Sequence, residues 1–213
     1  GAGSNILASE KGFQGLVVRP VYSDLRVMGN VIHAGAGAMM PHVAAYAQKE
    51  GLSGFEWAIG IPGTVGGSVR GNAGCNGSSM ADVVDSVRVY NAAFKRMKKL
   101  STADCRFGYR DSKFKHHPEL VILSAAIGLH PGGREAITEK MREYSLHRVA
   151  TQDIGSQCAG CVFKNIPWER VPFDRRERLL TRFPELQRFK NQSHIPTAFL
   201  IDVLGLKGHA IGG

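Results

Sequence analysis

GIPGTVGGSVRGNAG, residues 60–74, decides the fold, because its density of glycine excludes a regular helix and favours a tightly folded loop. Without side chains, backbone N–H groups approach a ligand closely, and consecutive N–H groups in such turns form an anion-binding concavity. Pro62 stiffens the turn, and Asn72 adds an amide. GAGSN, residues 1–5, has the same character with a serine hydroxyl and an asparagine amide. The alternative for both segments is a tight turn or a β-bulge without a ligand.

Outward from this stretch, the pattern predicts strands and helices that do not alternate regularly. Strands are expected at 15–20, 25–29, 31–37, 83–91 and 121–129, and helices at 39–51 and 134–149. The glycine-dense block 54–77 is not expected to contain a regular helix. We therefore predict an α+β protein rather than a doubly wound α/β fold. We place a domain boundary near Pro131, which divides the chain into residues 1–130 and 131–213.

The charge balance favours anionic partners. Lys and Arg number 27 against 18 Asp and Glu, a net charge of +9. Much of the excess lies in residues 168–190, where arginines alternate with Leu and Phe at helical spacing. This segment is either an amphipathic surface helix with a solvated basic face or a phosphate-facing surface. No apolar run approaches the roughly 20 residues that span a bilayer. The G-x-x-x-x-G-K-[ST] phosphate loop and the Rossmann G-x-G-x-x-G are both absent.

A third segment, FGYRDSKFK at residues 107–115, concentrates aromatic and basic side chains around Arg110. An arginine beside an aromatic residue is often an ordinary surface residue. If the site handles an oxyanion, however, a planar and permanently charged guanidinium is the group expected.

Two cysteines, Cys158 and Cys161, form a C-x-x-C pair in QCAGCVFKN. Zinc is disfavoured because the pair lacks a second pair of ligands at suitable spacing. A redox dithiol is disfavoured because VFKNIP does not begin a helix. Two buried thiols, or one thiol acting as an acid or nucleophile, remain open. The four cysteines and the lack of a signal-peptide pattern predict free thiols in a reducing compartment.

Together these segments resemble the UDP-N-acetylenolpyruvoylglucosamine reductases (MurB). The family pattern is G-x-G-S-N, then G-I-P-G-T-V-G-G with N-A-G, then Y-R-x-S-x-F-K, and last A-G-S-x-F-K-N-P. This chain has GAGSN, GIPGTVGG with NAG, YRDSKFK and AGCVFKN in that order, and LIDVLGLKG at residues 200–208 also resembles the family. The ordered set covers essentially the whole chain and is far more specific than any one motif.

The resemblance implies a monomeric flavoenzyme of peptidoglycan precursor synthesis in the cytoplasm. Such enzymes use NADPH to reduce bound FAD and pass hydride to the enolpyruvyl group of UDP-N-acetylglucosamine enolpyruvate, giving UDP-N-acetylmuramate. Residues 1–130 would form an FAD-binding domain of the vanillyl-alcohol-oxidase (PCMH) type, and 131–213 part of an α+β substrate-binding domain. The partners are then the UDP-sugar and NADPH, with no membrane, nucleic acid or metal.

The motif match also implies roles for individual residues. Arg110 matches the arginine that stabilises the enolate, and Cys161 replaces the proton-donor serine. Tyr109, Lys164 and Asn165 match positions beside the substrate. The residues that would line FAD are Gly1, Gly3, Ser4, Asn5, Gly60, Pro62, Gly63, Gly66, Gly67, Asn72 and Gly74.

The sequence departs from the family pattern in several places. Ile166 displaces the proline after FKN, and a charged insertion follows. The family's first strands and its C-terminal glutamate are expected to lie outside residues 1–213, so we expect this fragment to be inactive by itself. The chain lacks the tyrosine-bearing insert expected near the substrate domain in one subtype, so we expect it to be closer to the shorter subtype. Another FAD-linked oxidase or dehydrogenase of the same fold is an alternative function. A nucleic-acid-binding protein that uses the arginine-rich helix is a more remote one.

Overall fold

The computed structural model describes residues 3–151 and 162–210. The chain divides into two compact units, Gly1–Gln157 and Cys158–Gly213. Within the described ranges, no helix has both the length and the apolar character needed to cross a bilayer.

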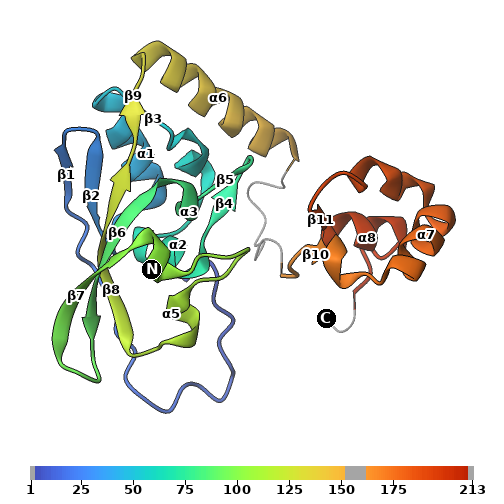
Figure 1. Ribbon diagram of the computed structural model, residues 1–213, viewed down its shortest axis with the longest axis horizontal. Helices are drawn as coiled ribbons and strands as arrows, with labels where there is room; N and C mark the ends of the chain where they lie inside the picture. Colours follow the sequence, from blue (N-terminus) through green and yellow to red (C-terminus); the bar gives the residue numbers. More distant parts are fainter. Residues whose placement is uncertain (1–2, 152–161, 211–213) are drawn as a thin grey trace. The chain divides into compact units, whose positions relative to one another are not determined.

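The first unit is organised around a five-stranded sheet in which every pairing is antiparallel (Figure 1). In spatial order the strands are β1 (Leu25–Met28), β2 (Val31–Gly35), β8 (Leu120–Gly128), β6 (Val84–Asn91) and β7 (Arg96–Ser101). Side chains alternate across the sheet, because Ile32 and Ala34 of β2 are buried while His33 between them is exposed. One face of the sheet therefore belongs to the core.

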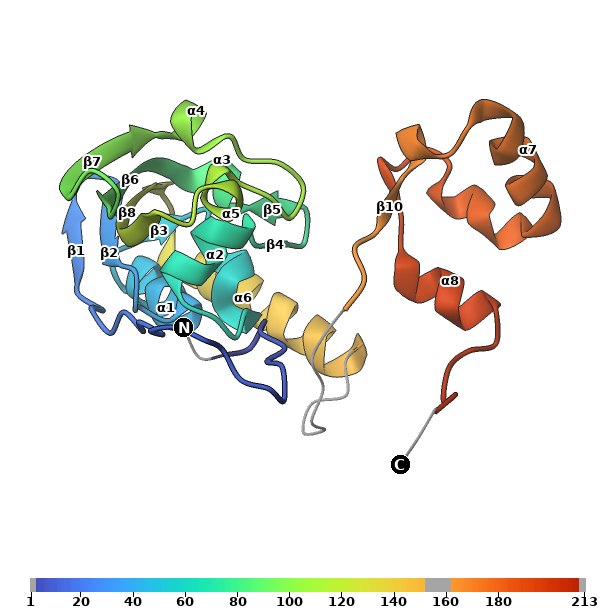
Figure 2. The same ribbon diagram turned by 90° about the horizontal axis from the view of Figure 1, so that it is seen from below.

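Helices and short strands supply the rest of this core (Figures 1 and 2). The helices are α1 (Met40–Lys49), η1 (Glu56–Gly60), α2 (Val65–Gly71), α3 (Met80–Val83), α4 (Thr102–Cys105), α5 (Lys113–His116) and α6 (Arg134–Thr151). Two small ladders pair β3 (Leu52–Ser53) with β9 (His130–Pro131) and β4 (Gly74–Cys75) with β5 (Ser78–Ser79). Phe55, Met80 and Phe114 are among the largest fully buried side chains of this unit.

The longest predicted elements are confirmed. The helix expected at 39–51 is α1, which has a proline in its first turn and is followed by Gly51 in a left-handed conformation. The strands expected at 83–91 and 121–129 are β6 and β8, and the helix expected at 134–149 is α6. Periodicity over many residues was sufficient for these elements.

The glycine-dense block contains a regular helix after all, since α2 occupies Val65–Gly71. Thr64 caps its first turn by accepting the Gly67 N–H, and Val65 and Val69 are completely buried. Tertiary packing and capping thus outweigh the low intrinsic helix propensity of glycine.

The prediction of a strand at residues 15–20 is wrong as well. This segment forms no strand in the described structure, and Leu16, Val17 and Val18 are 86%, 76% and 70% exposed. The chain joins the sheet only further on, where the Gly37 N–H donates to the carbonyl of Tyr22. An apolar β pattern needs a neighbouring strand to become a strand.

Helix α6 belongs to the first unit, which therefore extends past the predicted boundary near Pro131. Ile137 is buried, and Met141 and Tyr144 pack against the core of this unit. The assignment of residues 131–213 to substrate binding stays a prediction.

The second unit is small and has its own core. Its elements are β10 (Ile166–Pro167), η2 (Trp168–Arg170), α7 (Phe173–Arg182), η3 (Pro184–Phe189), β11 (His194–Ile195) and α8 (Thr197–Val203). Trp168, Leu186 and Ile195 are buried together. The Trp168 indole N–H also donates to the carbonyl of Phe189 at 2.8 Å, so the ring is held by packing and by a hydrogen bond.

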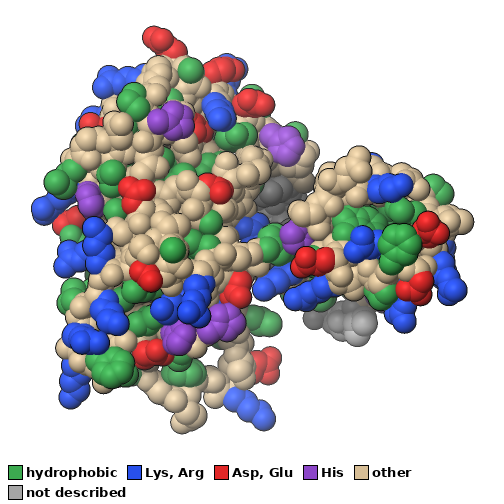
Figure 3. All heavy atoms as spheres, in the orientation of Figure 1, with side chains coloured by type: hydrophobic (Ala, Val, Ile, Leu, Met, Phe, Trp, Pro, Cys, Tyr) green, Lys and Arg blue, Asp and Glu red, His purple; other side chains and the backbone are tan. Residues whose placement is uncertain are grey.

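The arginine-rich segment 168–190 is not one helix. Pro172 precedes α7 and Pro184 opens η3, so the α-helical part is limited to Phe173–Arg182. Arg175, Arg178 and Arg182 of α7 are exposed, and Figure 3 shows Lys and Arg side chains on the visible surface of this unit. The helix thus has a solvated basic face, and a phosphate-facing role stays a prediction.

Candidate functional site

The two glycine-containing segments lie side by side in the first unit. A Cβ atom placed on Gly63 would lie 3.9 Å from Ser4 Oγ and 3.8 Å from Ser68 Oγ. Gly3, Ser4, Asn5 and Pro62 are all exposed, and the Ile6 N–H donates to the carbonyl of Gly3 in a turn. The exposed Ser4 and the buried Ser68 thus place their hydroxyl groups close to Gly63, and contact of this region with FAD stays a prediction.

Three other glycines of this region are closely approached by other parts of the protein. A Cβ on Gly60 would lie 2.9 Å from Arg148 Cδ, and one on Gly74 would lie 2.6 Å from the carbonyl oxygen of Ser78. A Cβ on Gly66 would lie 3.0 Å from the Cβ of Ala36. Close approach of the protein itself therefore explains Gly66 and Gly74 without a ligand, whereas the Arg148 side chain could move away from a Cβ at Gly60.

The backbone N–H groups at the start of α2 are used within the protein. Val65 and Gly66 donate to the carbonyls of Ala38 and Ala36, both at 2.9 Å, and Gly67 donates to Thr64 Oγ1. These three N–H groups therefore do not form the expected anion-binding concavity, because each already donates to an acceptor within the protein. Contact of Gly66 and Gly67 with FAD stays a prediction.

Asn72 connects α2 to the segment that carries Arg110. It is 7% exposed and adopts a left-handed conformation at the end of α2. Its amide nitrogen donates to the carbonyl of Gly108 at 2.8 Å, and its amide oxygen accepts the Ala81 N–H at 2.9 Å. Both ends of the side chain thus have protein partners, and its expected role at FAD stays a prediction.

Arg110 lies in a tight turn that joins Gly108 to Asp111. These two residues exchange backbone hydrogen bonds of 3.0 and 3.1 Å, and Arg110 between them has a φ of 52°. The Arg110 guanidinium donates from Nη2 to the carbonyl of Gly74 at 2.8 Å. Its Cζ lies 5.7 Å from the ring centre of Tyr109, which is 41% exposed. The structure therefore brings Arg110 to the end of the glycine-rich stretch, and its catalytic role stays a prediction.

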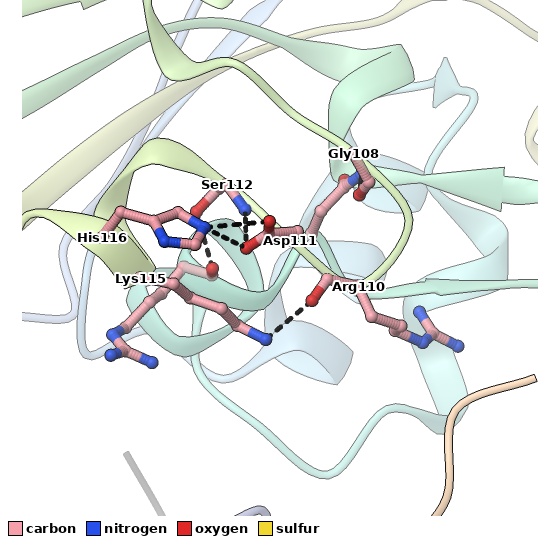
Figure 4. A network of polar contacts seen from close by, with 8 residues as sticks. Gly108, Arg110, Asp111, Ser112, Lys115 and His116 are labelled. Carbon is pink, nitrogen blue, oxygen red and sulfur yellow. Dashed lines mark hydrogen bonds and ion pairs between the residues drawn. The ribbon is translucent and has the colours of Figure 1, made fainter.

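The residues that follow Arg110 anchor its turn (Figure 4). His116 Nε2 lies 3.0 Å from Asp111 Oδ2, and the Ser112 hydroxyl donates to the carbonyl of Arg70 at 2.6 Å. The hydrogen bond from His116, with that from the Ser112 N–H, lowers the pKa of Asp111 against the opposing effect of its partial burial. The carboxylate stays ionised and holds the start of α5.

Two of the four cysteines, Cys75 and Cys105, lie among the described residues. Cys75 is exposed and Cys105 is buried, and both are free thiols. Burial, followed by the charge of Asp104, raises the pKa of Cys105 to about 11, so this thiol is not a nucleophile. Cys158, Cys161 and Gly1 lie outside the described residues. Among the residues that the structure describes, no group of three His, Cys, Asp or Glu is placed to hold a metal ion.

Lys164 and Asn165 belong to the second unit, where they contact the start of α8. The Thr197 hydroxyl donates to the carbonyl of Lys164 at 2.6 Å, and the Thr197 N–H donates to the side-chain oxygen of Asn165 at 3.3 Å. Their proximity to a substrate stays a prediction.

Comparison with known proteins decides the family. A family model described as an FAD binding domain matches residues 1–93. The UDP-N-acetylenolpyruvoylglucosamine reductase of Caldanaerobacter subterraneus subsp. tengcongensis is 41% identical over 216 residues, covering 100% of this chain and 62% of that protein. The protein of the same name from Solibacter usitatus is 32% identical and covers 100% of this chain and 66% of that protein. The chain belongs to the UDP-N-acetylenolpyruvoylglucosamine reductase family.

A solved structure of a MurB reductase agrees with this membership. The Thermus caldophilus UDP-N-acetylenolpyruvylglucosamine reductase matches with a TM-score of 0.55 at 32% identity, covering 62% of this chain and 48% of that chain. The predicted fold, an α+β protein with a PCMH-type FAD-binding domain, is confirmed. The chain spans 55% to 66% of the length of the curated reductases compared.

Two contacts in this chain were missed by sequence reasoning. Lys115 donates from Nζ to the carbonyl of Arg110 at 2.7 Å, and Arg148 of α6 crosses Gly60. Lys115 stands in the Y-R-x-S-x-F-K motif, so the motif was a usable signal. Arg148 is separated from Gly60 by most of the first unit's sequence, and no local pattern links the two.

Proposed function

We propose that the complete protein uses NADPH to reduce bound FAD and then reduces UDP-N-acetylglucosamine enolpyruvate to UDP-N-acetylmuramate. The observation that carries this proposal is the placement of Arg110, whose guanidinium is fixed on Gly74 at the end of the glycine-rich stretch. Family membership and the FAD binding domain match support it. The reaction belongs to peptidoglycan precursor synthesis, a cytoplasmic process that serves cell-wall growth, cell shape and division.

FAD would supply the hydride for the alkene carbon of the substrate. The residues that would hold it are Gly3, Ser4, Asn5 and the exposed part of the glycine-rich stretch around Pro62 and Gly63. Hydroxyl groups and closely approached backbone recognise phosphate and ribose. FAD, NADPH and the UDP-sugar are all anionic, so the net charge of +9 would attract them.

Arg110 would stabilise the negative charge that develops on the carboxylate-bearing side of the substrate as the enolate forms. A fixed, permanently charged guanidinium needs no reorganisation at that moment, which is the basis of electrostatic catalysis. Tyr109, Lys164 and Asn165 would contact the substrate. Cys161 would donate the proton that completes the reduction, because a thiol of ordinary pKa near 8.5 is mostly protonated at neutral pH.

The test of the reaction is NADPH oxidation by the complete, FAD-loaded protein. We expect oxidation to require the enolpyruvyl sugar nucleotide and to yield UDP-N-acetylmuramate, identified by mass spectrometry. A complete, folded protein that binds no FAD would overturn the proposal. Oxidation that proceeds with another acceptor and ignores the enolpyruvyl substrate would favour the alternative FAD-linked oxidase or dehydrogenase.

The role of Cys161 is tested separately by substitution. We expect Cys161→Ser to keep substantial turnover and Cys161→Ala to lose product formation by about 100-fold or more, with flavin reduction by NADPH unchanged in both. Cys158→Ala is the matched control and should have a mild effect. Equal damage from Cys158→Ala and Cys161→Ala would instead indicate a dithiol.

A further inference from the structure

The conformation of Arg110 requires a support of its own. Its φ of 52° lies in the left-handed region, which non-glycine residues rarely adopt. Such a conformation persists at a functional site only when neighbouring groups hold it. The hydrogen bonds between Gly108 and Asp111 close the turn around Arg110, but neither of them involves Arg110 itself.

Lys115 supplies a hydrogen bond directly to the main chain of Arg110. Its ammonium group lies 2.7 Å from the Arg110 carbonyl oxygen, and Figure 4 shows the side chain reaching back from α5 to that atom. A hydrogen bond from a charged donor is stronger than one between neutral groups. The contact therefore fixes the peptide plane that follows Arg110.

The base of the Lys115 side chain is itself rigid. Its neighbour Phe114 is 1% exposed in the core, and Ser112, also 1% exposed, holds the start of α5 through the carbonyl of Arg70. The core thus anchors α5, and α5 holds the Arg110 carbonyl through Lys115.

Arg110 is held at its other end by Gly74, which accepts the guanidinium hydrogen bond. The main chain is fixed by Lys115 and the charged end by Gly74, so the guanidinium has one position. We propose that Lys115 is a positioning residue for Arg110 in the reductase reaction, acting through the Arg110 carbonyl. This inference rests on the proposed function, because it concerns the step in which Arg110 meets the developing enolate.

Loss of Lys115 releases Arg110 without dismantling the turn. The Asp111 N–H still donates to Gly108, Asn72 still holds the Gly108 carbonyl, and Ser112 still anchors α5. The effect on the reaction is therefore confined to the step that uses Arg110. Delivery of hydride from NADPH to FAD does not use it.

The experiment separates the two half-reactions of the complete, FAD-loaded protein by rapid mixing. For Lys115→Met, we expect flavin reduction by NADPH within about twofold of wild type. Reoxidation of reduced flavin by the enolpyruvyl sugar nucleotide should slow by about tenfold or more, equivalent to about 1.4 kcal/mol. Lys115→Arg, which keeps a cationic donor, should recover reoxidation to within about threefold of wild type.

Lys113→Met is the matched control, since Lys113 lies on the same helix and makes no hydrogen bond to Arg110 among the described residues. Both half-reactions should be unchanged in it. Equal slowing of both half-reactions in Lys115→Met, or slowing of neither, would overturn the inference. If Lys115→Met is insoluble, Lys115→Gln replaces it under the same criteria. Failure of wild-type reduced flavin to react with the enolpyruvyl substrate would reject the proposed function instead.

Discussion

The two compact units differ in how their structure is maintained. The first has a five-stranded sheet and a continuous core that includes α1, α2 and α6, whereas the described core of the second consists of Trp168, Leu186 and Ile195 with partly buried neighbours. Small units bury a smaller fraction of their surface and are correspondingly less stable. The comparison predicts that removal of one large side chain unfolds the second unit. In the first unit, substitutions at close contacts or at a buried charge should lower the stability by smaller amounts.

The largest effect is expected for Trp168→Ala. Removal of this ring costs about 3–5 kcal/mol and also removes the hydrogen bond to Phe189. Hydrogen exchange should show loss of amide protection in α7 and α8, with protection of β8 in the first unit retained. Phe173→Ala, at a side chain 78% exposed on the same unit, should leave α7 and α8 protected. Protection of α8 that survives Trp168→Ala would contradict the weakness assigned to this unit.

A smaller effect is expected for Gly66→Ala in the first unit. The added methyl would lie 3.0 Å from the Cβ of Ala36 and 3.2 Å from its carbonyl oxygen, and such overpacking costs about 1–3 kcal/mol. Urea denaturation should report the loss. Gly71→Ala, in the same helix with no atom within 4 Å of the new methyl, should be neutral or stabilise by up to about 1 kcal/mol. Equal destabilisation by both variants would mean that the loss of stability comes from the helix backbone and not from contact with Ala36.

The smallest effect is expected for Glu56→Gln, and it depends on pH. Glu56 is 3% exposed; burial alone raises its pKa, but hydrogen bonds from Ser53 and the Gly54 N–H, with the charge of Lys140, lower the pKa below the ordinary 4.5. Because the pKa falls on folding, the contribution is present above about pH 4.5 and lost as pH falls through the lower folded value. The free energy of unfolding should drop by about 1 kcal/mol in Glu56→Gln at pH 7. A difference from wild type that is the same at pH 7 and about pH 3 would exclude ionisation as its source.

Long periodic segments of the first unit were predictable from sequence. The pattern of β8 identified a buried strand, and that of α6 identified an amphipathic helix, because each repeats over many residues. Residues 15–20 show the limit of this reasoning. Their apolar pattern is that of a strand, but whether a strand forms depends on a neighbour that the local sequence does not specify.

The candidate site was predictable in its residue types and less so in its contacts. The motifs indicated Arg110 and the glycine segments, and the structure places Arg110 against Gly74. The glycines could not be divided in advance into those that pack and those that face outward, because the partners of Gly60 and Gly66, Arg148 and Ala36, are remote in sequence.

The order of strands in the sheet has a consequence for synthesis. β8 lies between β2 and β6, so on this side of β2 the partner of Val31 is Gly128. As the chain leaves the ribosome, β2 must wait for almost a hundred further residues before it can pair with β8. Such long sequence separation slows folding and leaves apolar strand faces unpaired in the nascent chain. The sheet of the first unit therefore cannot be completed until translation passes β8.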